Sequence, residues 1–138
     1  MSDSVSSRPP ASVSVQVQIP FTYVVVHGDD PSLRSPVQKA ITKSLHLMGL
    51  TFETSRMEVG PLHISFTTSK LGRNLLEITL DLGSKFQTIE AIGQVDWYEK
   101  RSGVRGESFM VNVSFIDLQA DAVVVLRQYL QTVRETSR

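Results

Sequence analysis

The sequence predicts an all-β domain, an antiparallel barrel or sandwich, that is completed by one C-terminal α-helix. Short segments in which apolar and polar residues alternate recur from residue 13 to residue 115. A period of two is typical of strands with one buried face. Turn-forming residues separate these segments at short intervals, as in antiparallel sheets. The apolar period becomes helical only after residue 119.

The chain has the length of one domain with one core. Its 138 residues, of which 41% are hydrophobic, suffice to bury a core without disulfides. Residues 1–11 are rich in Ser and Pro and carry few large apolar side chains, so we expect a flexible tail. We expect a single domain over residues 12–135, with its helix at about 119–134.

The first strand is expected over residues 13–23. Its apolar positions, which alternate with polar ones, are Val13, Val15, Val17, Ile19, Phe21 and Tyr23. Pro20 lacks the N–H that a central strand would use, which indicates an edge position or a bulge. Residues 27–32, His-Gly-Asp-Asp-Pro-Ser, are typical of a loop.

Five more segments alternate in the same way and complete the predicted sheet. Their apolar positions are Leu45 and Leu47; Leu62, Ile64 and Phe66; Leu76, Ile78, Leu80 and Leu82; Ile89, Ala91, Gly93, Val95 and Trp97; and Phe109, Val111, Val113 and Phe115. Trp97 ends the fourth stripe, which favours packing in the core or at its rim; an exposed contact platform is the alternative. The charged, Gly-containing residues 100–107 predict a hairpin loop.

The C-terminal segment has helical periodicity. Its apolar positions are Val123, Leu126, Leu130 and Val133. Asp121 or Asp117 is the expected N-cap. We expect this helix to close an open end of the barrel. Val124 and Val125 widen the apolar stripe, so a dimer or oligomer contact is the alternative.

Composition excludes several classes of function. Fourteen basic and fourteen acidic side chains balance, so a general binder of nucleic-acid polymers is not expected. The chain contains no cysteine, which excludes disulfides and thiolate chemistry and suits a reducing compartment. The N-terminus lacks the apolar run of a signal peptide, and no segment is apolar enough to span a bilayer. We therefore expect a cytoplasmic protein.

Three segments resemble those of PilZ domains. The first is residues 18–23, Gln-Ile-Pro-Phe-Thr-Tyr, which resembles the strand that opens the barrel of that family. The second is residues 42–54, which resembles the turn and strand around the family's Asp/Asn-x-Ser-x-x-Gly motif. The third and most specific combines residues 93–97, Gly-Gln-Val-Asp-Trp, with residues 109–115 and the helix that follows.

The resemblance implies both a fold and an activity. The fold is an antiparallel barrel of six or more strands with a C-terminal helix, and the usual activity is binding of cyclic di-GMP, a bacterial second messenger. An Arg-x-x-x-Arg segment before the first strand pairs with the phosphates and the guanine edges. The Asp/Asn and Ser of the second motif reach base edges from one strand face, and its Gly lets the backbone approach closely.

The sequence departs from this pattern at nearly every polar position. Aligned on residues 19–20, Ser14 and Gln18 stand where the two arginines belong, and the nearest upstream arginine is Arg8. Aligned on Gly49, Ser44 takes the Asp/Asn position and His46 the Ser position, so only Gly49 agrees. The loss of two guanidinium groups predicts weak or no binding of cyclic di-GMP in the family's usual mode. The interval between the second and third segments is longer than usual, which indicates an extra strand or hairpin near residues 61–72.

Each of the other candidate sites has both a functional and a purely structural interpretation. Ser44 and His46 share the polar face of one strand, either as a remnant ligand or partner surface or as a solvated face. The three histidines lie on separate elements without metal-ligand spacing, so no metal is expected. Lys100, Arg101 and Arg105 form a solvated turn or a contact for a phosphate or an acidic partner. Arg34 is expected to pair with the acidic turn at residues 29–30.

These observations favour binding over catalysis. The chain contains no P-loop, no Gly-x-Ser-x-Gly, no His-Glu-x-x-His and no Gly-x-Gly-x-x-Gly, so no enzyme is expected. The first hypothesis is a PilZ-like adaptor that contacts a protein of motility, pilus assembly or surface attachment, as the resemblance implies. The second is a true cyclic di-GMP receptor in which Arg8, Arg34 or a second subunit supplies the missing charge. The third is an unrelated barrel such as an oligonucleotide-binding fold, against which the zero net charge counts.

Overall fold

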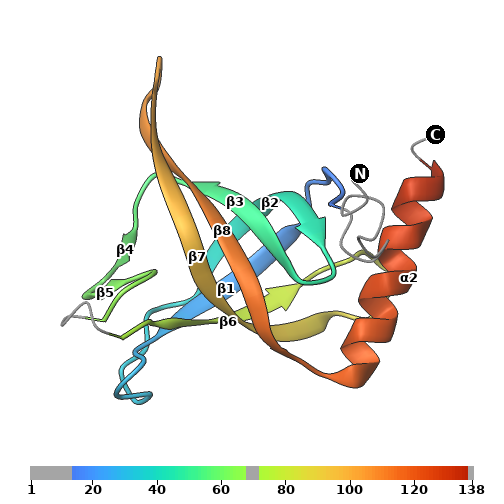
Figure 1. The fold of residues 1–138 in the computed structure, drawn as a ribbon, viewed down its shortest axis with the longest axis horizontal. Helices are drawn as coiled ribbons and strands as arrows, with labels where there is room; N and C mark the ends of the chain where they lie inside the picture. Colours follow the sequence, from blue (N-terminus) through green and yellow to red (C-terminus); the bar gives the residue numbers. More distant parts are fainter. Residues whose placement is uncertain (1–13, 68–71, 137–138) are drawn as a thin grey trace, which may run out of the picture.

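The computed structural model describes residues 14–67 and 72–136, so the predicted tail at residues 1–11 lies outside the described residues. Within them the chain forms eight strands and one helix (Figure 1). The elements are β1 (Pro20–Val26), β2 (Gln38–His46), β3 (Gly49–Thr54), β4 (Glu58–Val59), β5 (Leu62–His63), β6 (Leu75–Leu80), β7 (Ile89–Gly103), β8 (Gly106–Leu118) and α2 (Ala120–Thr136).

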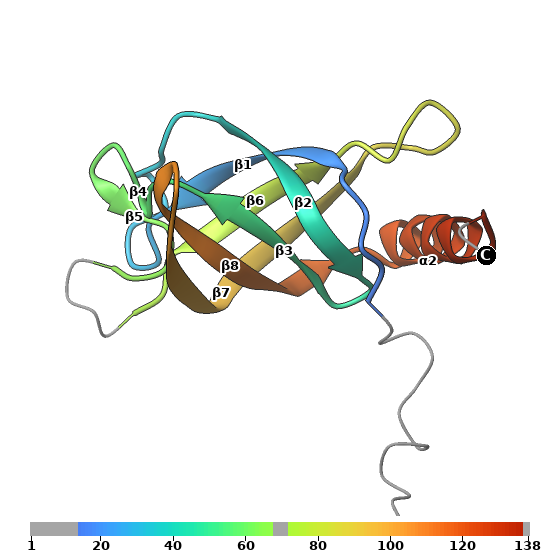
Figure 2. The same ribbon diagram turned by 90° about the horizontal axis from the view of Figure 1, so that it is seen from above.

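Six of these strands close into an antiparallel barrel. Their order is β1-β2-β3-β8-β7-β6, and β6 pairs back with β1. The predicted barrel with a C-terminal helix is therefore confirmed. The hairpin of β7 and β8 is the longest and projects beyond the barrel, while α2 lies at the other side of the molecule (Figures 1 and 2).

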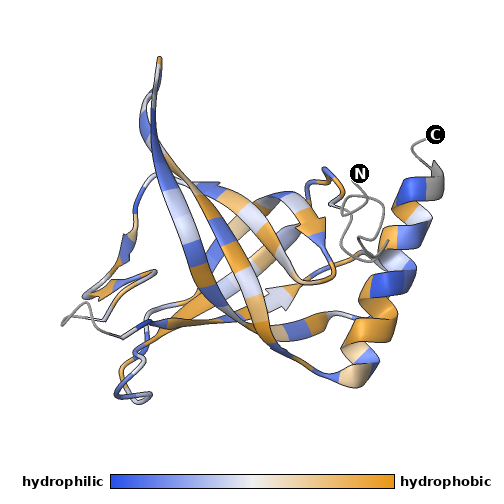
Figure 3. Ribbon diagram, viewed as in Figure 1, coloured by the Kyte–Doolittle hydropathy of each residue, from blue (hydrophilic) through white to orange (hydrophobic). Residues whose placement is uncertain are grey.

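The core fills the inside of this barrel. Alternate residues along each strand point inward, which gives the striped ribbon of Figure 3. Phe21, Tyr23 and Phe52 form an aromatic cluster in which neighbouring ring centroids lie 5.3 to 6.0 Å apart. Burial raises the pKa of the Tyr23 hydroxyl, an effect that a hydrogen bond with Thr54 partly offsets. The predicted stripes over residues 76–82 and 109–115 are the inward faces of β6 and β8 with their flanks.

The first strand begins later than predicted. β1 starts at Pro20, and residues 14–19 run beside β2 with one bridge, Val15 to Leu45. The closed barrel has no edge at β1, so the predicted edge position of Pro20 is wrong. Pro20 is tolerated because it is the first residue of its strand and because its pair with Ile41 is not a hydrogen-bonded pair. The backbone hydrogen bond is made by the neighbouring pair, in which the Thr42 N–H donates to the Ile19 carbonyl at 3.0 Å.

Residues 62–66 do not form a barrel strand, contrary to the prediction. β5 pairs only with β4, as a small hairpin outside the barrel, so the extra hairpin expected near residues 61–72 occurs slightly earlier in the chain. Asn74 fixes this insertion. Its buried amide donates to the carbonyls of His63 and Phe66, both at 2.7 Å, and accepts from the Gly28 N–H at 3.0 Å.

The predicted loop at residues 100–107 is mostly strand. β7 continues to Gly103 and β8 begins at Gly106, which leaves a two-residue turn. Gly106 has φ of +107°, a backbone conformation that other residues rarely adopt. The basic side chains are partly neutralised, since Lys100 lies 3.1 Å from Glu107 and Arg101 lies 3.5 Å from Glu99.

Helix α2 packs one stripe against an end of the barrel. Leu126 and Leu130 are buried, and Tyr129 meets Phe86 edge to face at 5.3 Å. The first helical bond runs from Val123 N–H to the Gln119 carbonyl, so Gln119 occupies the N-cap position and the prediction of Asp121 or Asp117 is wrong. No helix in the described part of the chain is both long and apolar enough to cross a bilayer.

Candidate functional site

Four polar or aromatic side chains line up across the outside of the barrel. Ser44 on β2 faces Thr51 on β3, Thr51 faces Asn112 on β8, and Asn112 faces Trp97 on β7. We call these residues the transverse row. Ser44 and Thr51 are linked by a hydrogen bond between their hydroxyls at 2.6 Å. The row therefore consists of three neutral hydrogen-bonding side chains followed by one aromatic ring.

Two β-bulges build this row. One lies between Thr42 and Ser44, and the other lies between Val95 and Trp97. A bulge adds a residue and so exchanges the inward and outward faces beyond it. Trp97 is therefore turned outward and is 49% exposed, while its neighbour Tyr98 packs at 6.2 Å from Phe109. The predicted core or rim position of Trp97 is wrong, and the geometry suits the alternative of an exposed platform.

The segment before β1 lies beside this row. The bridge between Val15 and Leu45 runs antiparallel, so Ser14 stands next to His46. Ser14 and Gln18 are exposed, whereas the apolar residues between them face the barrel. The structure thus brings Ser14, Gln18, Ser44, His46 and Gly49 to one end of the barrel, and their assignment to the two motifs stays a prediction.

Thr42 holds that segment in place. Its fully buried hydroxyl donates to the Val17 carbonyl and accepts from the Ile19 N–H at 2.9 Å. Sequence reasoning did not single out Thr42, because a threonine inside an alternating strand gives no signal of its partners.

His46 is shaped by the turn between β2 and β3. Its Nδ1 accepts a hydrogen bond from the Met48 N–H at 3.3 Å. Burial lowers the pKa of this imidazole from the ordinary value of 6.5, because a charged ring loses hydration there. His46 therefore takes up a proton less readily than an exposed histidine, and adds less positive charge to the site.

We expect the free energy of unfolding to fall as the pH drops below about 6.5. The pKa of His46 is lower in the folded chain than in the unfolded chain, so the unfolded chain takes up the proton first and gains stability relative to the folded one. The contribution is intact above pH 6.5 and is lost as the pH falls through the folded pKa. Urea unfolding between pH 7.5 and 5 measures it, and His46→Gln should flatten this part of the profile. An equal slope in both proteins would contradict the assignment.

Gly49 has a structural reason to be glycine. A Cβ at this position would lie 2.0 Å from the Val113 carbonyl oxygen, which belongs to the backbone of β8. The close approach of β3 and β8 thus explains the residue without any ligand.

Gly49→Ala is expected to destabilise the fold by about 1–3 kcal/mol, because one of two paired strands must shift. Gly103→Ala is the matched control, since its Cβ would meet only an ordinary contact at 3.8 Å. Chemical unfolding of both variants measures the difference. Similar stabilities for the two variants would show that the close approach of β3 and β8 does not matter.

Charges around the row are acidic or paired. The Asp96 carboxylate accepts a hydrogen bond from Ser114. The Glu53 carboxylate accepts one from Ser108 at 2.6 Å and lies 3.6 Å from Lys43; the hydroxyl first, and then the lysine, lower the pKa of Glu53. Among the residues that the structure describes, this face therefore offers no concentration of positive charge for a phosphate.

The remaining candidates lie elsewhere. Arg34 forms a bridge with Val26, the last residue of β1, which is six residues and thus roughly 20 Å from the start of that strand. Its guanidinium pairs with Glu77 on β6 rather than with the turn at residues 29–30. Arg8 lies outside the described residues. Among those described, no group of three or more His, Asp or Glu side chains is placed to hold a metal ion.

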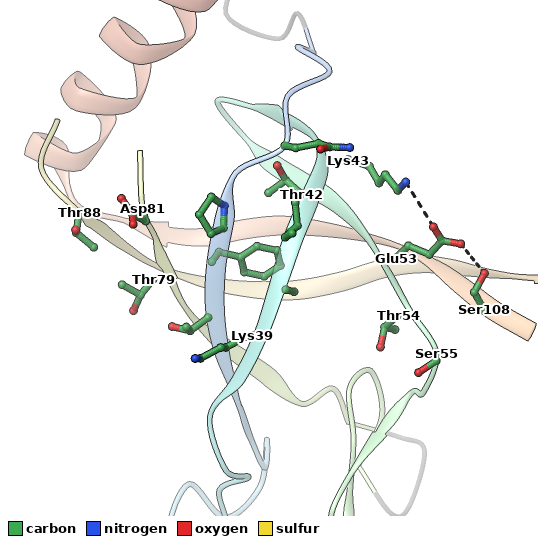
Figure 4. Close-up of a pocket in the computed structure, with 16 residues that line it drawn as sticks. Lys39, Thr42, Lys43, Glu53, Thr54, Ser55, Thr79, Asp81, Thr88 and Ser108 are labelled. Carbon is green, nitrogen blue, oxygen red and sulfur yellow. Dashed lines mark hydrogen bonds and ion pairs between the residues drawn. The ribbon is translucent and has the colours of Figure 1, made fainter. Parts of the chain in front are cut away.

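A larger groove opens next to the row (Figure 4). Its volume is about 980 Å³, and it runs over the outside of β1 and β2, between the ends of β3 and β6. It includes Gln18, and its walls carry Lys39, Ile41, Glu53 and Thr79. Sequence reasoning missed this groove, because it forms where β2 and β3 diverge and no residue pattern marks that divergence.

No family model matches this sequence, and no curated protein matches it significantly. Solved structures do match the fold. The PilZ domain of YcgR from Escherichia coli, solved with c-di-GMP, superposes with a TM-score of 0.62 at 9% identity, over 95% of each chain. The chain has the fold of a PilZ domain.

Two other PilZ-type barrels superpose at similarly low identity. Bacillus subtilis MotI/DgrA, an inhibitor of motility, gives a TM-score of 0.60 at 10% identity, over 95% of this chain and 54% of that one. Borreliella burgdorferi PlzA, solved with c-di-GMP, gives 0.52 at 9% identity, over 91% and 52%. The chain thus spans about half the length of these two proteins.

Proposed function

We propose that this PilZ-type barrel is a bacterial cytoplasmic signalling domain of the cyclic di-GMP network that acts by contacting another protein. It binds cyclic di-GMP weakly or not at all, and it carries out no catalysis. One observation supports this proposal: Ser14 and Gln18, which we align with the motif arginines, lie beside Ser44 and His46 on a face where the described residues give no excess of positive charge.

The size of the lost interaction supports this choice. Cyclic di-GMP carries two phosphates, and each hydrogen bond from a charged group contributes roughly 1.5–3 kcal/mol. Replacing two arginines by a serine and a glutamine therefore removes several powers of ten in affinity. The nearby carboxylates of Asp96 and Glu53 do not compensate for that loss.

The same face is suited to a protein partner. Trp97 is half exposed, and Met48 in the β2–β3 turn is exposed as well. Aromatic residues and methionine are enriched in protein interfaces. We infer a partner in motility, pilus assembly or surface attachment, and the likeness to an inhibitor of motility supports this class.

Affinity capture from a bacterial lysate tests the proposal, with and without added cyclic di-GMP. We expect the same partner in both samples and its loss with Trp97→Ala, because that substitution removes the largest exposed ring of the face. Val104→Ala, at the tip of the β7–β8 hairpin, is the control and should retain the partner. Capture that requires cyclic di-GMP would contradict the adaptor function.

A second candidate function is a receptor that binds cyclic di-GMP through other residues. The exposed ring of Trp97 and the amide of Asn112 favour it, since bases stack on aromatic rings and accept hydrogen bonds. Arg8 or a second subunit would supply the charge, whereas Arg34 is engaged with Glu77 at the far end. Unchanged binding after Arg8→Ala and Arg34→Ala would rule out these two arginines as the source of the charge and would leave only other residues of a second subunit.

Self-association through α2 stays a prediction. Leu126 and Leu130 are used by the barrel, while Val124 is 50% exposed on another face of the helix. Analytical ultracentrifugation of the parent chain and Val124→Glu tests whether this face holds two copies together.

A further inference from the structure

The first half of β2 is paired on one side only, so its other backbone edge is open although the barrel as a whole is closed. β2 pairs with β1 from Gln38 to Ile41, but its pairing with β3 begins only at Thr42. Beyond Phe52, β3 continues along β8 and leaves β2. The groove described above lies at this divergence, with residues of β2 on one wall and Glu53, Thr54 and Ser55 on the other (Figure 4).

The direction of the backbone groups follows from the register. Thr42 donates to Ile19, so Thr42 points toward β1. Because successive residues of a strand point to opposite neighbours, Lys39 and Ile41 direct their N–H and C=O groups away from β1 and into the groove. Among the described residues no strand pairs with them on that side. Unpaired groups of this kind are a template for another strand.

The side chains on this edge specify what can pair there. Val37, Lys39 and Ile41 occupy alternate outward positions, and Val37 and Ile41 are 62% and 57% exposed. Lys39 has no ion-pair partner among the described residues, in contrast to Lys43, which lies near Glu53. Directly opposed residues of paired strands interact, favourably when apolar or of opposite charge.

We propose that the open edge of β2 receives an extended segment of a partner protein, in which an acidic residue stands between two apolar residues at alternate positions. The acidic side chain pairs with Lys39, and the apolar ones cover Val37 and Ile41. Strand addition of this type draws its affinity from main-chain bonds and its specificity from alternate side chains. The inference rests on the proposed adaptor function and adds a second contact surface for the partner, next to the face that carries Trp97.

A second copy of this chain fits the edge less well. An antiparallel pair of two β2 edges centred on Lys39 would oppose the two lysines, and like charges directly opposite each other destabilise a sheet. Lysine on a free edge protects it against self-pairing for the same reason.

A synthetic peptide tests the proposal with the whole chain. The probe has the sequence Thr-Val-Thr-Glu-Thr-Val-Thr, blocked at both ends, and NMR titration reports binding together with protection of individual amides. We expect slowed hydrogen exchange at Lys39 and Ile41. N-methylation of the probe's glutamate should weaken binding about tenfold or more, because its N–H faces β2. N-methylation of the central threonines, whose N–H groups face away, should have little effect.

Charge exchange provides a second readout that does not depend on folding alone. Lys39→Glu should weaken binding of the glutamate probe about fivefold, and should favour a probe with lysine at that position by a similar factor. Arg127→Glu, on the exposed face of α2, is the control with the same change of charge and should leave both probes unaffected.

Three outcomes would overturn the inference. The first is that neither probe binds, and the second is that the two N-methylations have equal effects. The third is that protection of the Lys39 and Ile41 amides rises with protein concentration in the absence of peptide, which would mean that a second copy occupies the edge. Tight binding of cyclic di-GMP would instead refute the proposed adaptor function. The peptide titration would still decide whether the edge of β2 accepts a strand.

Discussion

Restoring the family's motif residues is expected to create tight cyclic di-GMP binding in this chain, for which we propose weak binding or none. The variant combines Ser14→Arg and Gln18→Arg with Ser44→Asp and His46→Ser. Two guanidinium groups would contribute about 3–6 kcal/mol, which corresponds to roughly two to four powers of ten in affinity. The positions already lie together at one end of the barrel, so the substitutions require no rearrangement of the fold.

Isothermal titration calorimetry of parent and variant measures this gain. A variant with Gln128→Arg and Gln131→Arg on α2 adds the same two guanidinium groups at another place and should gain nothing comparable. If the motif variant folds, as its melting curve would show, and still does not bind, then the face formed by Ser14, Gln18, Ser44 and His46 is not the nucleotide surface of this PilZ-type barrel. A gain in the helix variant would mean that charge alone suffices.

Thr42→Val is expected to cause the largest loss of stability connected with the site. The substitution leaves the buried Ile19 N–H and the partly buried Val17 carbonyl without this partner. Each unsatisfied buried group costs about 1–3 kcal/mol, so the free energy of unfolding should decrease by about 2–5 kcal/mol. Because valine has nearly the same shape, packing contributes little to the difference.

Thr42→Ser is the matched control. It keeps the hydroxyl and loses only a methyl group, and we expect it to retain most of the stability. Hydrogen exchange at Ile19 adds a local readout, since this amide should become unprotected in Thr42→Val before the barrel unfolds. Equal stability of the valine and serine variants would show that the hydroxyl does not hold the segment at residues 14–19.

The fold was predictable where a strand is regular. β6 and β8 alternate without interruption over their inward positions, and the helix shows a clear apolar stripe, so their type and faces follow from the sequence. The bulge before Trp97 was not predictable, because one extra residue has no composition of its own. It reversed the expected face of Trp97 and brought Tyr98 inward.

The candidate site was predictable only in the parts that a family motif marks. Ser44, His46 and Gly49 follow from one motif, and Ser14 and Gln18 follow from another. Thr51 and Asn112 join them only through strand register, which pairs residues about sixty positions apart and leaves no local trace in the sequence. The groove beside β2 depends on the same long-range pairing, and for this reason no sequence pattern predicts it.

The central claim is that this PilZ-type barrel works without tight binding of cyclic di-GMP, and calorimetric titration of the unmodified chain at physiological salt tests it most directly. We expect no measurable heat at high micromolar concentrations and no change in the melting temperature. Submicromolar binding would contradict the account. The domain would then be a receptor whose positive charge comes from outside the face formed by Ser14, Gln18, Ser44 and His46.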